Sequence, residues 1–399
     1  MMYVKIISME TPAINPTYVL DALQTLVRID STNPALHPGS AGEAEIAAYV
    51  AAELRRMGLA VEVELVAPGR PNVVGVLPGR GHGRSLLLNG HLDTVGVAEM
   101  EAPFSGELRG GKVYGRGAYD MKGSLAAMLG VAQALTAAGA QLDGDLIFTF
   151  VVDEETISRG TEALIQTLPR PLPQAAIVGE PTDLAICRAH RGFVWFDVET
   201  CGRAAHGSRF QEGIDANLRM GRFLAKLDRL EQALRRRPPH PLVGPPSLHA
   251  ARLEGGTEIS MYAAHCRLQV ERRTVPGETV AQTTAELQAL LDDLSTADPI
   301  FKGTVRATFA RDPFTVPADA AIVRALAQAA AARLGRPPAH VGQSYWTDAA
   351  LFAAAGIETA IIGPIGAGLH SQVEWVDAQS VVDLAHILAE TAVIYCAHR

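Results

Sequence analysis

The first half of the chain alternates between hydrophobic patterns of helical period and of strand period. Asn15 and Pro16 provide an N-cap and a first turn for the amphipathic segment YVLDALQTLVRI, and AEIAAYVAAELRRMG predicts a second helix that ends at Gly58. Short apolar runs follow, each bounded by glycine, proline or charge as buried strands are: VEVELV, NVVGVL, SLLLNG, LIFTFVV and AAIVGE. Helices are predicted between these runs, at 122–138 and 160–166. This alternation predicts an α/β fold, a mainly parallel sheet flanked by helices.

The middle of the chain has a different pattern. From Arg191 onward the segments FVWFDVETCG and CRLQVERR alternate polar with apolar residues, which predicts strands that have one face in water. Two longer helices are predicted at 216–234 and 279–294, and the proline-rich connector 235–246 is excluded from any helix interior. Strands of this kind together with two helices indicate a small antiparallel α+β domain.

After Asp312 the first pattern returns. Helices are predicted at 318–334, after Thr347 and from Asp377 onward, and TAIIGP predicts a further strand. We therefore expect an α/β domain in two parts, residues 1–190 and 312–399, interrupted by an inserted α+β domain at 191–311. A chain of 399 residues exceeds the size at which one hydrophobic core stops growing, which agrees with two domains.

Charge and hydropathy exclude several kinds of partner. A net charge of −8 argues against nucleic acid, which requires a basic surface. No apolar run approaches the roughly 20 residues that span a bilayer, so we expect no membrane segment. The opening MMYVKIISMETP has a single early lysine and lacks a small-residue cleavage site, which predicts no signal peptide and a cytoplasmic protein.

The cysteines predict neither a disulfide framework nor a metal site. They lie far apart and none has the CxxC spacing. We expect all four to be small buried hydrophobic residues. They are Cys187, Cys201, Cys266 and Cys396.

Acidic residues and histidines follow the predicted strands repeatedly. In an open α/β sheet, ligands gather at the carboxyl ends of the strands. Asp120 lies in a glycine-rich loop, GRGAYDMKG, directly ahead of a helix. The other residues of this kind follow four apolar runs: His91, Asp93, Asp153, Glu154, Glu155, Glu180, His370 and Glu374. Taken singly, each has an ordinary structural interpretation, such as a helix N-cap for Asp120 or a polar turn for DEE.

Taken together, these residues favour a metal site. Burying so many carboxylates at one edge of a sheet is costly unless a cation balances their charge. Two imidazoles and three carboxylates suit zinc, and they also suit cobalt or manganese. We therefore predict two divalent metal ions, roughly 3.5–4 Å apart as in hydrolytic metal pairs. Their predicted ligands are His91, Asp120, Glu155, Glu180 and His370.

Two further acids have separate predicted roles. Asp93, two residues after His91, is placed to hydrogen-bond the other ring nitrogen of that histidine and fix its tautomer. Glu154 adjoins the predicted ligand Glu155, but its side chain is expected to point in a different direction, which suits a general base. As the base, Glu154 would take a proton from a metal-activated water and return it to the departing amine.

These motifs resemble those of a known family, the dinuclear zinc metallopeptidases and deacylases that include acetylornithine deacetylase, succinyl-diaminopimelate desuccinylase, aminoacylase-1 and glutamate carboxypeptidase. The resemblance spans essentially the whole chain and rests on five ordered motifs: NGHLDTV, GRGAYDMKG, DEET, GEPTD and GLHSQVEWV. It implies a zinc-exopeptidase-like α/β domain with an inserted ferredoxin-like lid domain that commonly dimerises. It also implies that Asp120 bridges the two metals, that His91 and Glu180 hold one ion, and that Glu155 and His370 hold the other.

The resemblance extends to the predicted inserted domain. GRAAHGSR resembles a lid segment whose histidine, here His206, stabilises the developing oxyanion, often in the active site of the partner subunit. ERRTVPGE resembles the lid strand whose arginine, here Arg273, binds the substrate carboxylate, and a surface-strand arginine is the alternative interpretation. Ser260 stands where many members of the family carry an asparagine that helps to bind substrate.

We therefore expect an enzyme that hydrolyses the amide bond of an N-acyl-amino acid, as deacetylases and desuccinylases do. A dipeptidase or a glutamate-carboxypeptidase-like exopeptidase is the alternative, and the substrate in either case is a small molecule, an N-acyl-amino acid or a dipeptide. A non-catalytic binding protein on the same scaffold is disfavoured, because all five predicted ligands and Glu154 are present. We also expect a homodimer formed through the lid.

Overall fold

The computed structural model describes residues 10–397, which form two compact units. Most of the opening segment, on which the expectation of no signal peptide rests, lies outside the described residues. Of the described residues, unit 1 comprises 10–188, 316–341 and 347–397, and unit 2 comprises Ala189–Thr315 and Gly342–Trp346. Unit 1 is therefore assembled from stretches of chain on both sides of unit 2.

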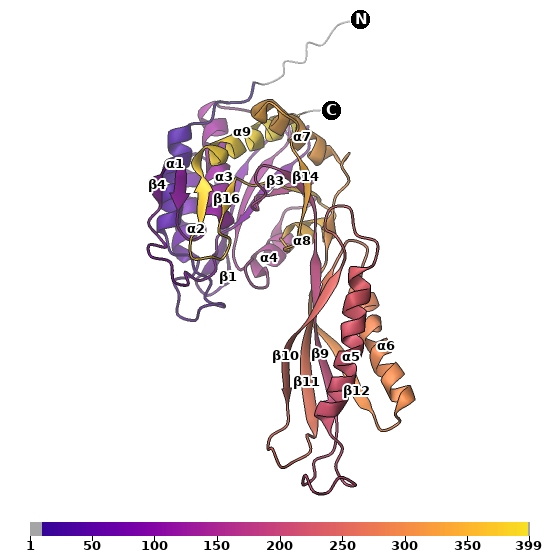
Figure 1. Cartoon of the computed structure of the whole chain (residues 1–399). Helices are drawn as coiled ribbons and strands as arrows, with labels where there is room; N and C mark the ends of the chain where they lie inside the picture. Colours follow the sequence, from indigo (N-terminus) through magenta and orange to yellow (C-terminus); the bar gives the residue numbers. More distant parts are fainter. Residues whose placement is uncertain (1–9, 398–399) are drawn as a thin grey trace, which may run out of the picture. The chain divides into compact units, whose positions relative to one another are not determined.

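The helices of unit 1 begin at local sequence signals. The Asn15 side chain accepts the N–H of Tyr18 at 3.2 Å where α1 begins, and Asp377 accepts the N–H of Ser380 at 2.8 Å where α9 begins. Figure 1 shows helices on both sides of the strands, with α3 and α9 on one side and α4 and α8 on the other. The bounds are α1 Pro16–Arg28, α2 Ala44–Arg56, α3 Gly123–Ala137, α4 Arg159–Thr167, α7 Ala321–Leu334, α8 Ala349–Ala354 and α9 Ala378–Tyr395.

The main sheet is parallel at its centre and antiparallel toward its edges. Its order is β1-β2-β6-β3-β7-β15-β8-β13, and β14 pairs with β8. The neighbours β6, β3, β7 and β15 run parallel, whereas β1, β2 and β8 join antiparallel. The bounds are β1 Ala60–Ala67, β2 Arg70–Leu77, β3 Leu86–His91, β6 Leu146–Val151, β7 Ala175–Val178, β8 Ile186–His190, β13 Phe314–Thr315, β14 His340–Gln343 and β15 Glu358–Ile361.

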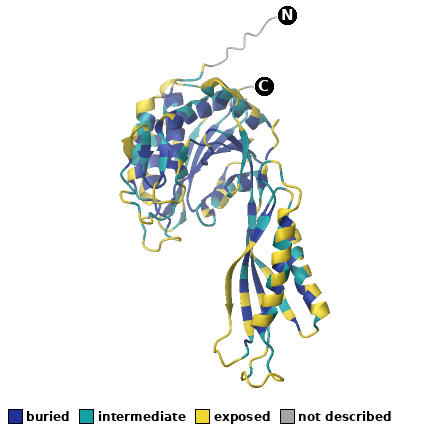
Figure 2. Cartoon of the chain, in the orientation of Figure 1, coloured by how far each residue is buried: buried dark blue, intermediate teal, exposed yellow. Residues whose placement is uncertain are grey.

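The predicted sheet is thus confirmed at its centre. Figure 2 shows the central strands buried, and every residue of β3, β6 and β7 is buried. Burial on both faces explains why these strands read as continuous apolar runs in the sequence. The antiparallel edges were not part of the expectation.

A smaller sheet joins two loops of unit 1 that are far apart in the sequence. Its order is β16-β17-β5-β4, and β17 pairs antiparallel with β5. The segment between β16 and β17 contains His370, and β5 leads into the loop that contains Asp120. The bounds are β4 Glu107–Arg109, β5 Lys112–Tyr114, β16 Gly366–Ala367 and β17 Trp375–Asp377.

Unit 2 has the βαββαβ order of a ferredoxin-like fold, as expected. Its antiparallel sheet has the order β10-β11-β9-β12. Helices α5 and α6 cover one face of this sheet through a core that includes Phe196, Phe223 and Leu268. Because strand side chains alternate, Phe193 and Trp195 lie on the opposite face, where their ring centroids are 5.4 Å apart. The bounds are β9 Gly192–Cys201, α5 Ala216–Arg235, β10 Ser247–Gly255, β11 His265–Thr274, α6 Val280–Ala297 and β12 Lys302–Arg311.

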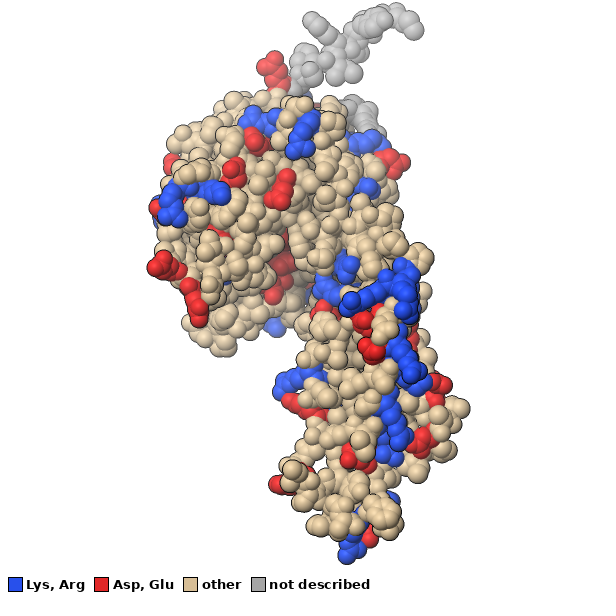
Figure 3. Space-filling view, in the orientation of Figure 1, with Lys and Arg blue, Asp and Glu red and all other residues tan. Residues whose placement is uncertain are grey.

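Basic side chains line the α5 side of unit 2, as Figure 3 shows. Several of them are paired with acids of α6 or of the residues just after it, such as Arg222 with Asp298 at 2.7 Å and Lys226 with Asp293. This row of positive charge is therefore partly neutralised within the unit.

Membrane segments and disulfides were both expected to be absent. Among residues 10–397, no helix combines the length and the apolar character that crossing a bilayer requires. None of the four cysteines forms a disulfide within residues 10–397; three are buried, and Cys201 is half-buried rather than buried as expected.

Candidate metal centre

The carboxyl ends of the parallel strands bring the predicted residues together. β3 ends at His91, which pairs in register with Val151 of β6. The turn that follows β6 and contains Glu155 therefore begins beside His91. β7 pairs with the other side of β3, and its last residue, Val178, lies two positions before Glu180.

Asp120 reaches the same edge from an irregular turn ahead of α3. Residues Ala118–Lys122 form one π-type turn, inside which Asp120 has the non-helical angles φ −116° and ψ 91°. The preceding Gly117 has φ 78°, and a Cβ there would lie 2.5 Å from the Thr94 side chain, so the turn requires glycine. No side chain caps the start of α3, so Asp120 does not act as an N-cap.

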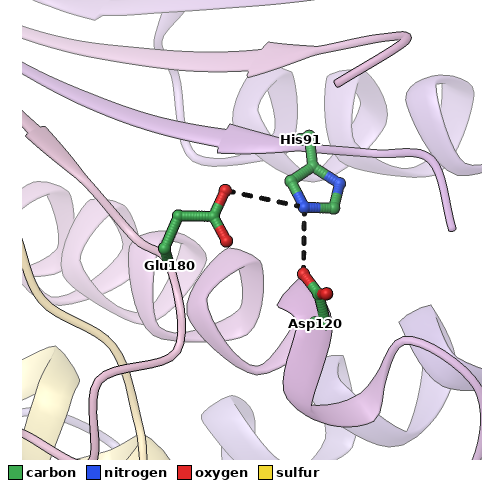
Figure 4. A group of neighbouring side chains, drawn as sticks. All are labelled: His91, Asp120 and Glu180. Atoms are coloured by element: carbon green, nitrogen blue, oxygen red, sulfur yellow. Dashed lines mark hydrogen bonds and ion pairs between the residues drawn. The ribbon is translucent and has the colours of Figure 1, made fainter. Parts of the chain in front are cut away.

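The side chains of His91, Asp120 and Glu180 converge on one point, as Figure 4 shows. The Nε2 atom of His91 lies 3.1 Å from Oδ1 of Asp120 and 3.8 Å from Oε1 of Glu180. His91 and Glu180 are buried and Asp120 is half-buried. The three potential ligand atoms lie within 4.8 Å of one another, close enough for one cation to contact all three.

A second group forms around the other oxygen of Asp120. The Nε2 atom of His370 lies 3.3 Å from Oδ2 of Asp120 and 3.2 Å from Oε2 of Glu155. These atoms also lie within 4.8 Å of one another. The two carboxylate oxygens of Asp120 therefore face different histidines, which is the arrangement of a carboxylate that bridges two cations.

Unpaired oxygens show that both groups fit a divalent cation. Oε1 of Glu155 and Oε1 of Glu180 are buried and accept no hydrogen bond, which is costly unless a positive group balances them. Tetrahedral ligands at about 2.0–2.1 Å from zinc lie roughly 3.3 Å apart. The separations of 3.1–3.8 Å between the donor atoms are close to that value. Zinc, cobalt and manganese all accept this mixture of imidazole and carboxylate.

Burial and neighbouring charges shift the pKa values of the side chains in both groups. Burial and then the charge of Asp120 raise the pKa of Glu155. Burial would also raise the pKa of Asp120, but hydrogen bonds with His370 and His91 hold it below its ordinary value. Hydrogen bonds to Asp120 and Glu155 raise the pKa of His370 to about 10. The carboxylates and imidazoles of the two groups therefore influence one another's protonation.

Both the backbone carbonyl oxygen and the carboxylate of Asp93 face the ring of His91, and the carbonyl oxygen is the nearer of the two. The Nδ1 atom of His91 lies 2.9 Å from the carbonyl oxygen of Asp93 and 3.6 Å from its carboxylate. The carboxylate also accepts the N–H groups of Glu154 at 3.2 Å and Glu155 at 3.1 Å. Asp93 therefore fixes both the ring of His91 and the turn that carries the two glutamates.

Glu154 is half-buried beside the first group and belongs to neither of the two ligand groups found among the described residues. Burial, followed by the charge of Glu180, raises its pKa well above the ordinary value. A carboxylate whose pKa is shifted toward neutrality is suited to accept and return a proton.

Behind Asp93 lies a buried polar network that the sequence patterns do not reveal. Asn33 donates to Oδ2 of Asp93 at 2.8 Å and to Oδ1 of Asp153 at 3.2 Å. Arg70 binds Asp153 at 2.7 Å and also binds both oxygens of Glu43. All five side chains are buried. The signal in the sequence is slight: Arg70 is a charged residue at the start of an apolar strand.

Asp348 is a further buried acid of unit 1. Its Oδ2 accepts a 2.6 Å hydrogen bond from Thr161, and its Oδ1 has no hydrogen-bond partner. Burial raises its pKa to about 6.

His206 and Arg273 belong to unit 2, whereas both ligand groups belong to unit 1. His206 is exposed and its Nδ1 lies 2.8 Å from Oγ of Ser208. The carbonyl oxygen of Ser260 accepts the N–H of Gly207 at 2.7 Å, so the segment that departs from the family pattern lies beside His206. Arg273 lies 5.5 Å from the ring centroid of Phe193 and donates to the backbone of unit 2.

Comparisons with known proteins identify the family of this chain. Residues 87–393 match Peptidase family M20/M25/M40. Acetylornithine deacetylase of Myxococcus xanthus is 30% identical over 364 residues, which cover 88% of this chain and 92% of that protein. N-formyl-4-amino-5-aminomethyl-2-methylpyrimidine deformylase of Bacillus subtilis is 28% identical over 387 residues, covering 89% and 90% of the two chains. The fold is also similar to that of the YXEP protein of Bacillus subtilis, a dinuclear metal-binding peptidase of the M20 family (TM-score 0.74, 17% identity, 95% of this chain and 98% of that one).

Proposed function

This chain belongs to peptidase family M20/M25/M40 and is an amide or peptide hydrolase, and we propose that it removes the acyl group from an N-acyl-amino acid. The observation that carries the metal-dependent hydrolysis in this proposal is the position of Asp120, whose two oxygens face His91 and His370 at 3.1 and 3.3 Å. We propose that His91 and Glu180 hold one zinc ion, that Glu155 and His370 hold the other, and that Asp120 bridges them. Cobalt or manganese would fit the same donors.

Bound divalent ions would supply Lewis acidity, which polarises the amide carbonyl and acidifies a water molecule. The chain must then move a proton, and Glu154 is the proposed carrier. Glu154 would first take a proton from water and later give it to the departing nitrogen. Its raised pKa favours the protonated carboxyl group that must persist between these two transfers. Asp93 would keep Glu154 in place, because it accepts the N–H of that residue at 3.2 Å.

Two residues of unit 2 complete the proposal. The imidazole of His206 is exposed and would donate to the developing oxyanion. The guanidinium of Arg273 would bind the free α-carboxylate of the substrate by paired hydrogen bonds. Arg273 donates a hydrogen bond to the backbone at Ser344 and contacts the ring of Phe193, and these two interactions would hold its guanidinium in position for that carboxylate.

We further propose a cytoplasmic homodimer that forms through unit 2, in which His206 acts on the active site of the partner. Several large apolar side chains of unit 2 are exposed: Phe210, Leu218, Leu253, Ile259 and Met261. Pairing of two copies of unit 2 would remove such side chains from water, which is favourable. The mass of the protein in solution tests this proposal, since a monomer would rule out action of His206 on a partner.

The acyl group distinguishes the deacylase from its alternative, a dipeptidase or carboxypeptidase. The relative that is 30% identical over nearly the whole chain is a deacetylase, which favours the deacylase. The test is hydrolysis of a panel of N-acetyl- and N-succinyl-amino acids, dipeptides and folyl-type substrates with added zinc or cobalt. We expect cleavage of the N-acyl-amino acids. Cleavage of dipeptides alone would replace the proposal with the peptidase, and no cleavage of any amide by the metal-loaded protein would contradict both.

A further inference from the structure

A buried ion pair joins the loop that carries His370 to the loop that carries Asp120. The Nη1 atom of Arg116 lies 2.6 Å from Oε2 of Glu374, and both side chains are only 1% exposed. Arg116 precedes Asp120 by four positions, and Glu374 follows His370 by four positions. Neither residue belongs to a ligand group found among the described residues, so the pair lies next to the metal ligands without being one of them.

Glu374 binds the backbone of the Asp120 turn directly. Its Oε1 accepts the N–H groups of Tyr119 and Asp120, both at 3.0 Å. Its Oε2 accepts the N–H of Gly117 at 3.0 Å in addition to the guanidinium of Arg116. One carboxylate therefore satisfies three backbone donors of a single irregular turn, including the donor of the bridging residue itself.

Arg116 binds the other loop through its remaining donors. Nη2 donates to the carbonyl oxygen of Ser371 at 2.9 Å, and Nε donates to the carbonyl oxygen of Gly96 at 3.0 Å. Ser371 directly follows His370, whose φ of 57° is in the left-handed region. A non-glycine residue seldom adopts this conformation, and the carbonyl that Arg116 fixes at the next residue restrains it.

A buried ion pair is seldom a net source of stability, because removing two charges from water costs about as much as their attraction returns. It does specify one arrangement when its polar atoms are satisfied, and here each guanidinium nitrogen of Arg116 donates a hydrogen bond and both oxygens of Glu374 accept them. We propose that Glu374 and Arg116 are positioning residues that hold Asp120 and His370 in the mutual orientation required by the metal ion that both would bind. This inference rests on the proposed two-metal function.

The two metal sites should depend unequally on the pair. The group of Asp120, Glu155 and His370 takes two of its three ligands from the loops that the pair joins. The group of His91, Asp120 and Glu180 takes only Asp120 from them. Loss of the pair should therefore weaken binding of one zinc equivalent much more than binding of the other.

The test is competition for zinc between the full-length protein and a chromophoric chelator. Glu374→Gln keeps the shape of the side chain but removes the charge and two of the acceptor positions. Glu278→Gln is the matched control, because the Glu278 carboxylate likewise binds a buried arginine, Arg272, and accepts a backbone N–H, that of Val275 at 3.0 Å, but in unit 2. We expect Glu374→Gln to raise the Kd of one zinc equivalent at least tenfold and that of the other much less. Glu278→Gln should leave both Kd values within twofold of wild type.

Each result decides between the claims. A wild-type protein that binds no zinc contradicts the proposed function itself. If the wild type binds two equivalents and folded Glu374→Gln binds both as tightly, or if Glu278→Gln is equally impaired, the positioning role is wrong. If Glu374→Gln does not fold, the inference is tested with Arg116→Lys and with the wild type. Arg116→Lys loses the contacts to Gly96 and Ser371 and should show the same unequal loss. Amide hydrogen exchange in the wild type should show Gly117, Tyr119 and Asp120 protected, and exchange at the rate of an open loop would overturn the inference.

Discussion

Asn33 donates a 2.8 Å hydrogen bond to the carboxylate of Asp93, the residue whose carbonyl oxygen holds the ring of His91. The same amide nitrogen lies 3.2 Å from the carboxylate of Asp153. Asn33 thus separates two buried negative charges with a neutral donor. The arrangement links the stability of unit 1 to the position of one proposed metal ligand.

Asn33→Leu should lower the free energy of unfolding by about 1–3 kcal/mol, because buried acceptors lose their donor. Urea unfolding followed by circular dichroism measures this change. Asn89→Leu is the control, since Asn89 is also buried but donates to a neutral hydroxyl, that of Thr149 at 3.1 Å. The control should lose less, because hydrogen bonds to charged groups are roughly twice as strong. Equal stability of Asn33→Leu and wild type would show that the bond contributes nothing.

Asn33→Asp should make stability fall as the pH rises. The substitution places a third carboxylate beside two others, so its pKa in the folded protein lies above the ordinary value of about 3.9 in the unfolded chain. The group is then protonated and tolerated at low pH, and its repulsion appears as the pH rises through the folded pKa. Urea unfolding at several pH values measures the difference from wild type, which should grow with pH. A difference that is constant with pH would contradict this expectation.

Glu154→Gln should lower kcat by about 10²–10⁴-fold, the usual contribution of a general acid–base group. Zinc content should stay at the wild-type value, because Glu154 belongs to neither ligand group. Elemental analysis and steady-state kinetics on the same preparation measure both quantities. Glu162→Gln, an exposed acid on α4, is the control and should leave both unchanged. Joint loss of zinc and activity in Glu154→Gln would assign it a metal-binding role instead.

Zinc binding should release protons at neutral pH. Hydrogen bonds to Asp120 and Glu155 raise the pKa of His370 to about 10, so this imidazole is protonated below that pH and must lose its proton to bind a metal. Zinc affinity should consequently fall as the pH falls. The same shift stabilises the metal-free protein fully below a pH of about 6.5, and this stabilisation is lost as the pH rises through about 10. Calorimetric titration with zinc in buffers of different ionisation enthalpy counts the protons, and His370→Ala should release fewer. Heats that do not depend on the buffer would contradict the shift.

Among the strands that the sequence predicts, those at the centre of the main sheet are buried on both faces. The strands β3, β6 and β7 are continuous apolar runs because helices cover both sides of the sheet. The sequence does not predict β10, in which most residues are exposed, nor the pairs of two- and three-residue strands around the His370 loop. Elements that short or that polar leave no period to detect.

The candidate site divides in the same way. The proposed ligands could be predicted because each follows a strand or precedes a helix at one edge of the sheet. The side chains that support them could not, because their partners are joined only by folding. Arg116 and Glu374 are 258 positions apart, and Arg70 and Asp153 are 83 positions apart, with no local pattern in either case. The contact between the His91 ring and a backbone carbonyl oxygen likewise cannot be predicted from the residue types of a motif.

The most direct test of the two-metal account is anomalous diffraction from crystals of the protein grown with zinc. The account predicts two peaks roughly 3.5–4 Å apart, with Asp120 between them. One peak should contact His91 and Glu180, and the other should contact Glu155 and His370. A single peak, or zinc bound elsewhere with none at Asp120, would contradict it.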